Sequence, residues 1–211
     1  RDFVDHLDSL PGGESGTLLL DITAPRAENG AAADELKRFF SKQGLLGLKA
    51  GIGIPATPDR PSVGCRVQFQ QSKALVEVIA TDSLAQSWVP FGKFTLPVKE
   101  GEKFETAKFA DELAEGILNR LVRAQLSRGP RVSGKQTYKL RVDNASPLVL
   151  NGLGILGMAT KQADTGKILP PLSLSPRRSM TLPASEAVVK HLELKKGAGG
   201  VRVVAADFSA L

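Results

Sequence analysis

The alternation of apolar and polar residues predicts several β-strands in the first 100 residues. Short apolar runs that end at turn residues predict strands at residues 16–25, 47–55 and 93–98. Two alternating segments, one around Val67 and one around Leu75, are joined by the polar residues "QQSK", and this pattern is typical of a β-hairpin.

Helical spacing of apolar residues predicts two main helices in the same part of the chain. Residues 27–44 carry a stripe that includes Leu36 and Phe40, and they end at Gly44, which suits a glycine C-cap. From Thr106 a second apolar face continues, with acidic residues early and arginines late, until Gly129-Pro130 ends the predicted helix. A short helix is also expected within residues 1–10.

The pattern changes after residue 130. Residues 131–136 are interpreted as a linker, and alternating segments at 137–143, 147–156, 178–183 and 201–209 predict strands, with one short helix at 185–197. We therefore expect an α+β fold in two domains. Residues 1–130 would form an antiparallel or mixed sheet with two main helices, and residues 131–211 a small all-β, sandwich-like (Ig-like) domain.

The glycines of "NGLGILG" match the spacing of a dinucleotide-binding turn, G-x-G-x-x-G, at Gly152, Gly154 and Gly157. That turn requires a long helix directly after it, because the pyrophosphate binds at the helix N-terminus. Only a short segment separates Gly157 from Gly166, and Pro170-Pro171 follow. We interpret the three as glycines within a β-strand, and no cofactor is expected.

Charge is distributed unevenly along the chain. The net charge is +6, but residues 1–130 hold 16 Lys and Arg against 17 Asp and Glu, whereas residues 131–211 hold 12 against 5. The excess positive charge therefore lies in the last part of the chain, which is an indication of an acidic partner. The apolar runs are too short to span a membrane.

Few residues suit metal or nucleophilic chemistry. With one cysteine and two histidines, a thiolate zinc site is excluded, and Asp2, Asp5 and His6 are more simply a solvated helix face. No G-x-S-x-G motif is present, although a triad that uses His6 or His191 stays open, since its members would meet only in space.

The candidate binding residues are basic and lie after residue 130. They are Lys135, Lys139, Arg141, Arg177, Arg178, Lys195, Lys196 and Arg202. Single-stranded nucleic acid is usually bound with stacking aromatic residues, and this part offers only Tyr138 and Phe208. A solvated surface or a face that docks on an acidic protein is therefore favoured over nucleic acid.

We expect a non-enzymatic binding or protein-interaction module. Because the chain begins at Arg1 rather than Met, we also expect it to be part of a larger, exported protein. One alternative is a hydrolase-type enzyme that uses carboxylates such as Asp21, Glu77 or Asp82, and another is an anion or nucleic-acid binder that uses the basic tail.

Overall fold

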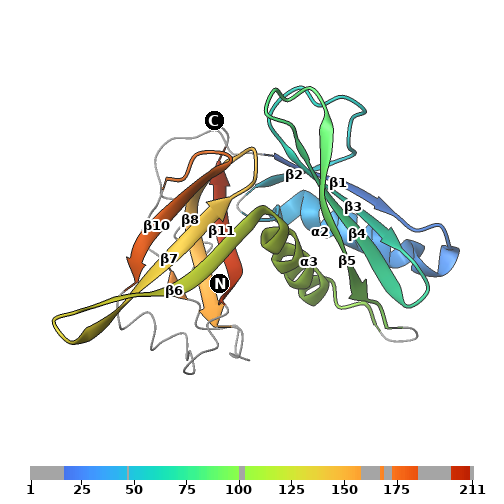
Figure 1. The fold of residues 1–211 in the computed structure, drawn as a ribbon. Helices are drawn as coiled ribbons and strands as arrows, with labels where there is room; N and C mark the ends of the chain where they lie inside the picture. The colour runs from blue at the N-terminus through green and yellow to red at the C-terminus, as the bar shows by residue number, and fades with distance from the viewer. Residues whose placement is uncertain are drawn as a thin grey trace.

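The computed structural model describes residues 17–46, 48–99, 103–157, 167–168, 173–184 and 201–209. The predicted helices at 1–10 and 185–197 lie outside these residues, as do His6, His191, Lys195 and Lys196. Figure 1 shows a five-stranded sheet at the right, smaller sheets at the left, and a helix between them.

The five-stranded sheet has the strand order β2-β1-β3-β4-β5. Its strands are β1 (Thr17–Thr23), β2 (Lys49–Ile52), β3 (Val63–Phe69), β4 (Lys73–Thr81) and β5 (Trp88–Pro97). β1 runs parallel to β2 and β3, whereas the β3–β4 and β4–β5 pairs are antiparallel. The sheet is therefore mixed, and the predicted hairpin is β3–β4.

The helices cover one face of this sheet. The short 3-10 helix η1 (Ala27–Asn29) leads into α2 (Gly30–Gln43), and α3 (Thr106–Leu121) follows β5. α2 contacts β1 and β2, α3 contacts β5, and the two helices contact each other. Fully buried Leu36 and Phe40 from α2 and Leu113 from α3 join one core with the alternate residues of the strands. α2 ends as predicted at Gly44, whose φ of +66° favours glycine.

The prediction that the second helix continues to Gly129 is wrong. α3 ends at Leu121, and strand β6 (Val122–Val132) begins at the next residue. From Val122 to Ser127 less exposed and exposed positions alternate, which is the period of a strand, and β6 pairs with β7 (Lys135–Asn144). The segment interpreted as a linker is the end of this hairpin, and Ser133 and Gly134 form its turn with φ of 49° and 78°.

Two antiparallel three-stranded sheets make up the rest of the described chain. Their strand orders are β10-β7-β6 and β11-β8-β9, with β8 (Val149–Gly157), β9 (Lys167–Ile168), β10 (Arg178–Ala184) and β11 (Val201–Ser209). The three glycines of the G-x-G-x-x-G pattern lie in β8, so the interpretation as strand glycines is confirmed. A Cβ atom at Gly154 would lie 3.0 Å from that of Ala205 on β11, which explains the small residue there.

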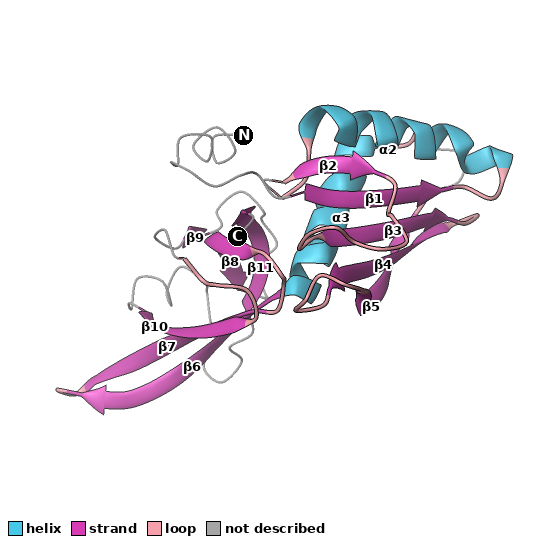
Figure 2. Cartoon of the chain, turned by 90° about the horizontal axis from the view of Figure 1, so that it is seen from above, coloured by secondary structure: helices cyan, strands magenta, loops and turns pink. Residues whose placement is uncertain are grey.

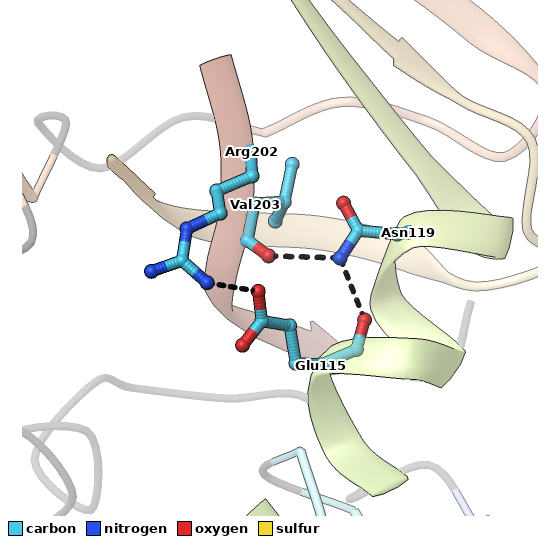
Figure 3. A network of polar contacts seen from close by, with 4 residues as sticks. All are labelled: Glu115, Asn119, Arg202 and Val203. Atoms are coloured by element: carbon cyan, nitrogen blue, oxygen red, sulfur yellow. Dashed lines mark hydrogen bonds and ion pairs between the residues drawn. The ribbon is translucent and has the colours of Figure 1, made fainter. Parts of the chain in front are cut away.

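α3 connects the five-stranded sheet to β11 through polar contacts (Figure 3). Arg202 Nη1 on β11 lies 2.6 Å from Glu115 Oε1, and Asn119 Nδ2 donates to the Val203 carbonyl at 3.2 Å. Asn119 also donates to the Glu115 carbonyl at 2.7 Å, which orients its side chain along the helix. The bonds to Arg202 and Val203 hold the last turns of α3 against the β11-β8-β9 sheet.

The fold is α+β, as predicted. The division of the chain near residue 131 stays a prediction, and that residue lies within β6, where it pairs with Gln136. Among the described residues, no helix has both the length and the apolar composition needed to cross a membrane.

Candidate functional site: an arginine-lined hollow at the end of a cationic sheet face

The outer face of the β10-β7-β6 sheet is polar and carries most of its charge as cations. Strand register places Arg123, Asp143 and Ser179 in one row across the sheet, and Gln125, Arg141 and Thr181 in the next. The following row holds Ser127, Lys139 and Pro183. We call these three rows the cationic face. The opposite face carries apolar residues such as Leu140 and Val142, whose burial fixes which side each charge faces.

One end of the cationic face opens into a hollow of about 670 Å³. Its charged lining consists of Arg120 from α3, Arg123 from β6, Arg141 and Asp143 from β7, Arg177 just before β10 and Arg178 at the first position of β10. Val89, Pro90 and Phe91 of β5 form an apolar wall. We call this site the arginine hollow. It is built by β5 of the five-stranded sheet, by α3 and by the β10-β7-β6 sheet.

Arg120 is held in place by its surroundings. Its Nη2 donates to the Lys93 carbonyl at 3.0 Å and its Nη1 to the Gly116 carbonyl at 3.4 Å. The guanidinium carbon lies 4.6 Å from the centre of the Phe94 ring, which is a cation–π contact. Gly92, with φ of +141°, leaves room for the side chain, because a Cβ there would lie 3.1 Å from Arg120 Cγ.

Arg177 is held at the opposite side. It adopts a positive φ of 56°, and its Nη2 donates to the Thr81 carbonyl at 2.6 Å, across 96 residues of chain. Thr81 is fully buried at the end of β4. This bond connects the segment just before β10 directly to the end of β4 in the five-stranded sheet.

Buried Asn144 positions the segment that carries Arg177 and Arg178. Its Nδ2 donates to the carbonyls of Leu148, Leu174 and Ser175 at 2.8, 3.1 and 3.3 Å. Its Oδ1 accepts hydrogen bonds from the backbone and hydroxyl of Ser146. The amide thus fixes residues 174–175 just before the two arginines.

Asp143 is the only carboxylate among the lining residues that the structure describes. A hydrogen bond from Ser179 lowers its pKa, and the Arg141 Nε atom, 2.9 Å from Oδ1, lowers it further. Arg123 adds a longer-range attraction. Arg178 lines the hollow with an exposed side chain and forms no hydrogen bond or ion pair with the described part of the chain.

The predicted binding residues are partly brought together. Arg141, Arg177 and Arg178 line the arginine hollow, Lys139 lies on the cationic face, and Lys135 lies beside the hairpin turn. Arg202 lies elsewhere, paired with Glu115. The β6–β7 hairpin that carries Lys135 extends away from the rest of the molecule (Figure 2).

Sequence reasoning missed three residues of this site. In the sequence, Arg120 and Arg123 fit the cationic end of a predicted helix, and no local pattern distinguishes Asn144. The alternation of Val122, Ala124 and Leu126 was the signal that Arg123 belongs to a strand.

The carboxylates considered for hydrolysis have other contacts. Glu77 lies between Arg66 at 3.1 Å and Lys93 at 3.2 Å, and the hydrogen bonds from these two residues lower its pKa. Asp82 accepts from the Gln86 backbone N–H at 2.9 Å and from Ser87, and these bonds lower its pKa as well. Asp21 lies beside Arg66 in register and lines a hollow of about 560 Å³ together with Glu77. Glu77 and Asp82, with lowered pKa values and partners that hold the ionised form, are not suited to donate a proton.

Metal ligands do not gather in the described residues, where no three His, Cys, Asp or Glu side chains could hold an ion together. The predicted Asp2, Asp5 and His6 group lies outside them.

Comparison with known proteins assigns no family. No family model matches the chain, and no curated protein matches it. A solved structure, the crystal structure of TolB from Acinetobacter baumannii, is 10% identical over 76% of this chain, with a TM-score of 0.28. The match covers 51% of that chain, so this protein spans about half its length. A likeness at this TM-score supports no inference about fold or function.

Proposed function

We propose that this chain is a non-enzymatic binding module that holds an acidic partner protein on the cationic face. The observation that carries the proposal is the placement of Arg123, Arg141 and Lys139 on one exposed sheet face with Asp143 as the single acidic neighbour in the three rows. Asp143 is already neutralised by Arg141. The face therefore presents uncompensated positive charge to a partner.

We further infer that the β10-β7-β6 and β11-β8-β9 sheets belong to an Ig-like sandwich that displays this face. Contact between β11 and β6 supports the inference, as does the shared burial of Leu140, Val142, Leu153 and Ile155. Export of the parent protein stays a prediction.

A labelled acidic peptide tests the proposed function by fluorescence anisotropy. Reversing two charges, in Arg123→Glu/Lys139→Glu, should abolish binding, and raising the salt concentration should weaken the wild-type interaction because exposed charges are screened. Lys49→Glu, on the exposed edge strand β2, is the matched control and should bind as the wild type does.

Two results would contradict the proposal. One is equal binding by wild type and the double variant, and the other is a peptide affinity that salt does not change. Tight binding of single-stranded DNA that survives added salt would instead favour the nucleic-acid alternative.

A further inference from the structure

We propose that the arginine hollow is a binding site for a phosphoryl oxyanion. The inference deepens the proposed function, because it names the chemical group that one end of the cationic face would take. The cationic face and the hollow share Arg123 and Arg141, but the hollow adds Arg120, Arg177 and Arg178.

The charge of the hollow calls for an anion. Five guanidinium groups surround one carboxylate, which leaves four positive charges in excess among the lining residues that the structure describes. Their mutual repulsion is only partly screened by water, because the five guanidinium groups line one common hollow. An anion that reaches several of them at once removes this repulsion.

Every cation that lines the hollow is an arginine, whereas the lysines Lys135 and Lys139 lie outside it. A guanidinium presents a planar fork of N–H donors that matches the spacing of phosphate oxygens, while an ammonium acts as a point charge. A carboxylate has two oxygens and needs few donors, and Asp143 already receives hydrogen bonds from Arg141 Nε and from Ser179. A phosphoryl group has three oxygens and up to two charges, so it can use several arginines at once.

The site is partly preorganised. Arg120 and Arg177 are already fixed by backbone carbonyls and by the Phe94 ring, so little side-chain entropy is lost when they bind a ligand. Arg178 is exposed and unpaired in the described part of the chain, so it can close on the anion. The volume of the hollow, about 670 Å³, is larger than that of a phosphate ion. The apolar wall of Val89 and Phe91 can therefore contact the rest of a molecule that carries the phosphoryl group.

The test titrates inorganic phosphate into the whole chain and measures binding by isothermal titration calorimetry. A parallel titration with acetate shows how a carboxylate binds. Saturable phosphate binding is expected, with acetate weaker. Arg178→Met should weaken phosphate binding about tenfold, the loss expected for a charge-assisted hydrogen bond, and Arg178→Lys should recover only part of it. Lys49→Met, on the exposed edge strand β2 and outside both the cationic face and the hollow, is the matched control and should leave phosphate affinity unchanged.

O-phosphoserine and a nucleoside monophosphate then distinguish the sources of the phosphoryl group. If O-phosphoserine binds more tightly than inorganic phosphate, the phosphoryl group belongs to a phosphorylated side chain. If the nucleoside monophosphate binds more tightly, it belongs to a nucleotide. The inference is overturned if phosphate binding does not saturate, if acetate binds equally well, or if Lys49→Met weakens phosphate binding as much as Arg178→Met does. Phosphate binding without acidic-peptide binding would refute only the proposed function, and the reverse result would refute only this inference.

Discussion

Replacing Gly116 with alanine tests the packing that holds Arg120 in the hollow. Gly116 lies inside α3, and a Cβ atom there would fall 2.3 Å from both Cε2 and Cζ of the Phe94 ring. Carbon atoms do not approach so closely, so the ring must move. Because the same ring lies against the Arg120 guanidinium, its displacement removes the cation–π contact as well.

Two opposing effects decide the size of the change. Alanine is favoured over glycine within a helix by about 1 kcal/mol. Overpacking in a well-filled region costs about 1–3 kcal/mol, and an exposed cation–π contact is worth about 0.5–1 kcal/mol. Phe94 is a rigid ring between β5 and α3, so we expect packing to win, with a net loss of about 1–2 kcal/mol. For a chain of this length that lowers Tm by about 2–8 °C.

Urea unfolding followed by circular dichroism measures the loss. The double variant Gly116→Ala/Phe94→Leu should be less affected than the sum of its two single variants, since leucine leaves room for the methyl group. Gly30→Ala, at a helical position where a Cβ meets nothing within 4 Å, is the matched control and should not destabilise. A Gly116→Ala protein more stable than wild type would show that helix propensity outweighs the clash and refute the reasoning.

Four further predictions follow from buried or paired polar groups and from the strand pairing. Asn144→Asp places a carboxylate against three carbonyl oxygens and should cost about 2–4 kcal/mol in urea unfolding, and a smaller cost would mean that the amide is not needed there. Hydrogen bonds from Arg66 and Lys93 lower the pKa of Glu77 in the folded protein. The ionised carboxylate therefore stabilises the fold above the unfolded-state pKa of about 4.3, and this stabilisation is lost as pH falls through the folded-state pKa. Glu77→Gln should flatten the acid side of a curve of Tm against pH. Burial raises the pKa of Asp207, so the ionised carboxylate destabilises the folded protein at neutral pH. Asp207→Asn should therefore raise Tm at pH 7, and the gain should disappear below about pH 4, where the carboxyl is protonated in both states. An equal gain in Tm at both pH values would exclude ionisation as its cause. A fragment of residues 122–211 keeps β6 paired with β7, whereas residues 131–211 lack most of that strand, so only the longer one should give dispersed amide NMR signals.

Local periodicity was enough to predict most elements, because each element must bury one face. The α2 stripe with its glycine cap, the β3–β4 hairpin and the glycine-rich strand β8 were all predicted correctly from nearest-neighbour patterns. The end of α3 was predicted wrongly, because Val122 fits the apolar face of a helix as well as it fits a strand. Pairing with β7 supplies backbone hydrogen bonds that favour the strand, and that pairing is invisible before the hairpin closes.

The arginine hollow was decided by tertiary structure alone. The sequence showed that residues 131–211 are basic, which determines the sign of the charge but not where the side chains converge. Arg177 reaches Thr81 only because the second part of the chain docks on the first, and Arg120 joins it only because α3 lies between the sheets. Positions so far apart in sequence share no local pattern, so their proximity follows from the packing of whole elements and not from the residues that surround each of them.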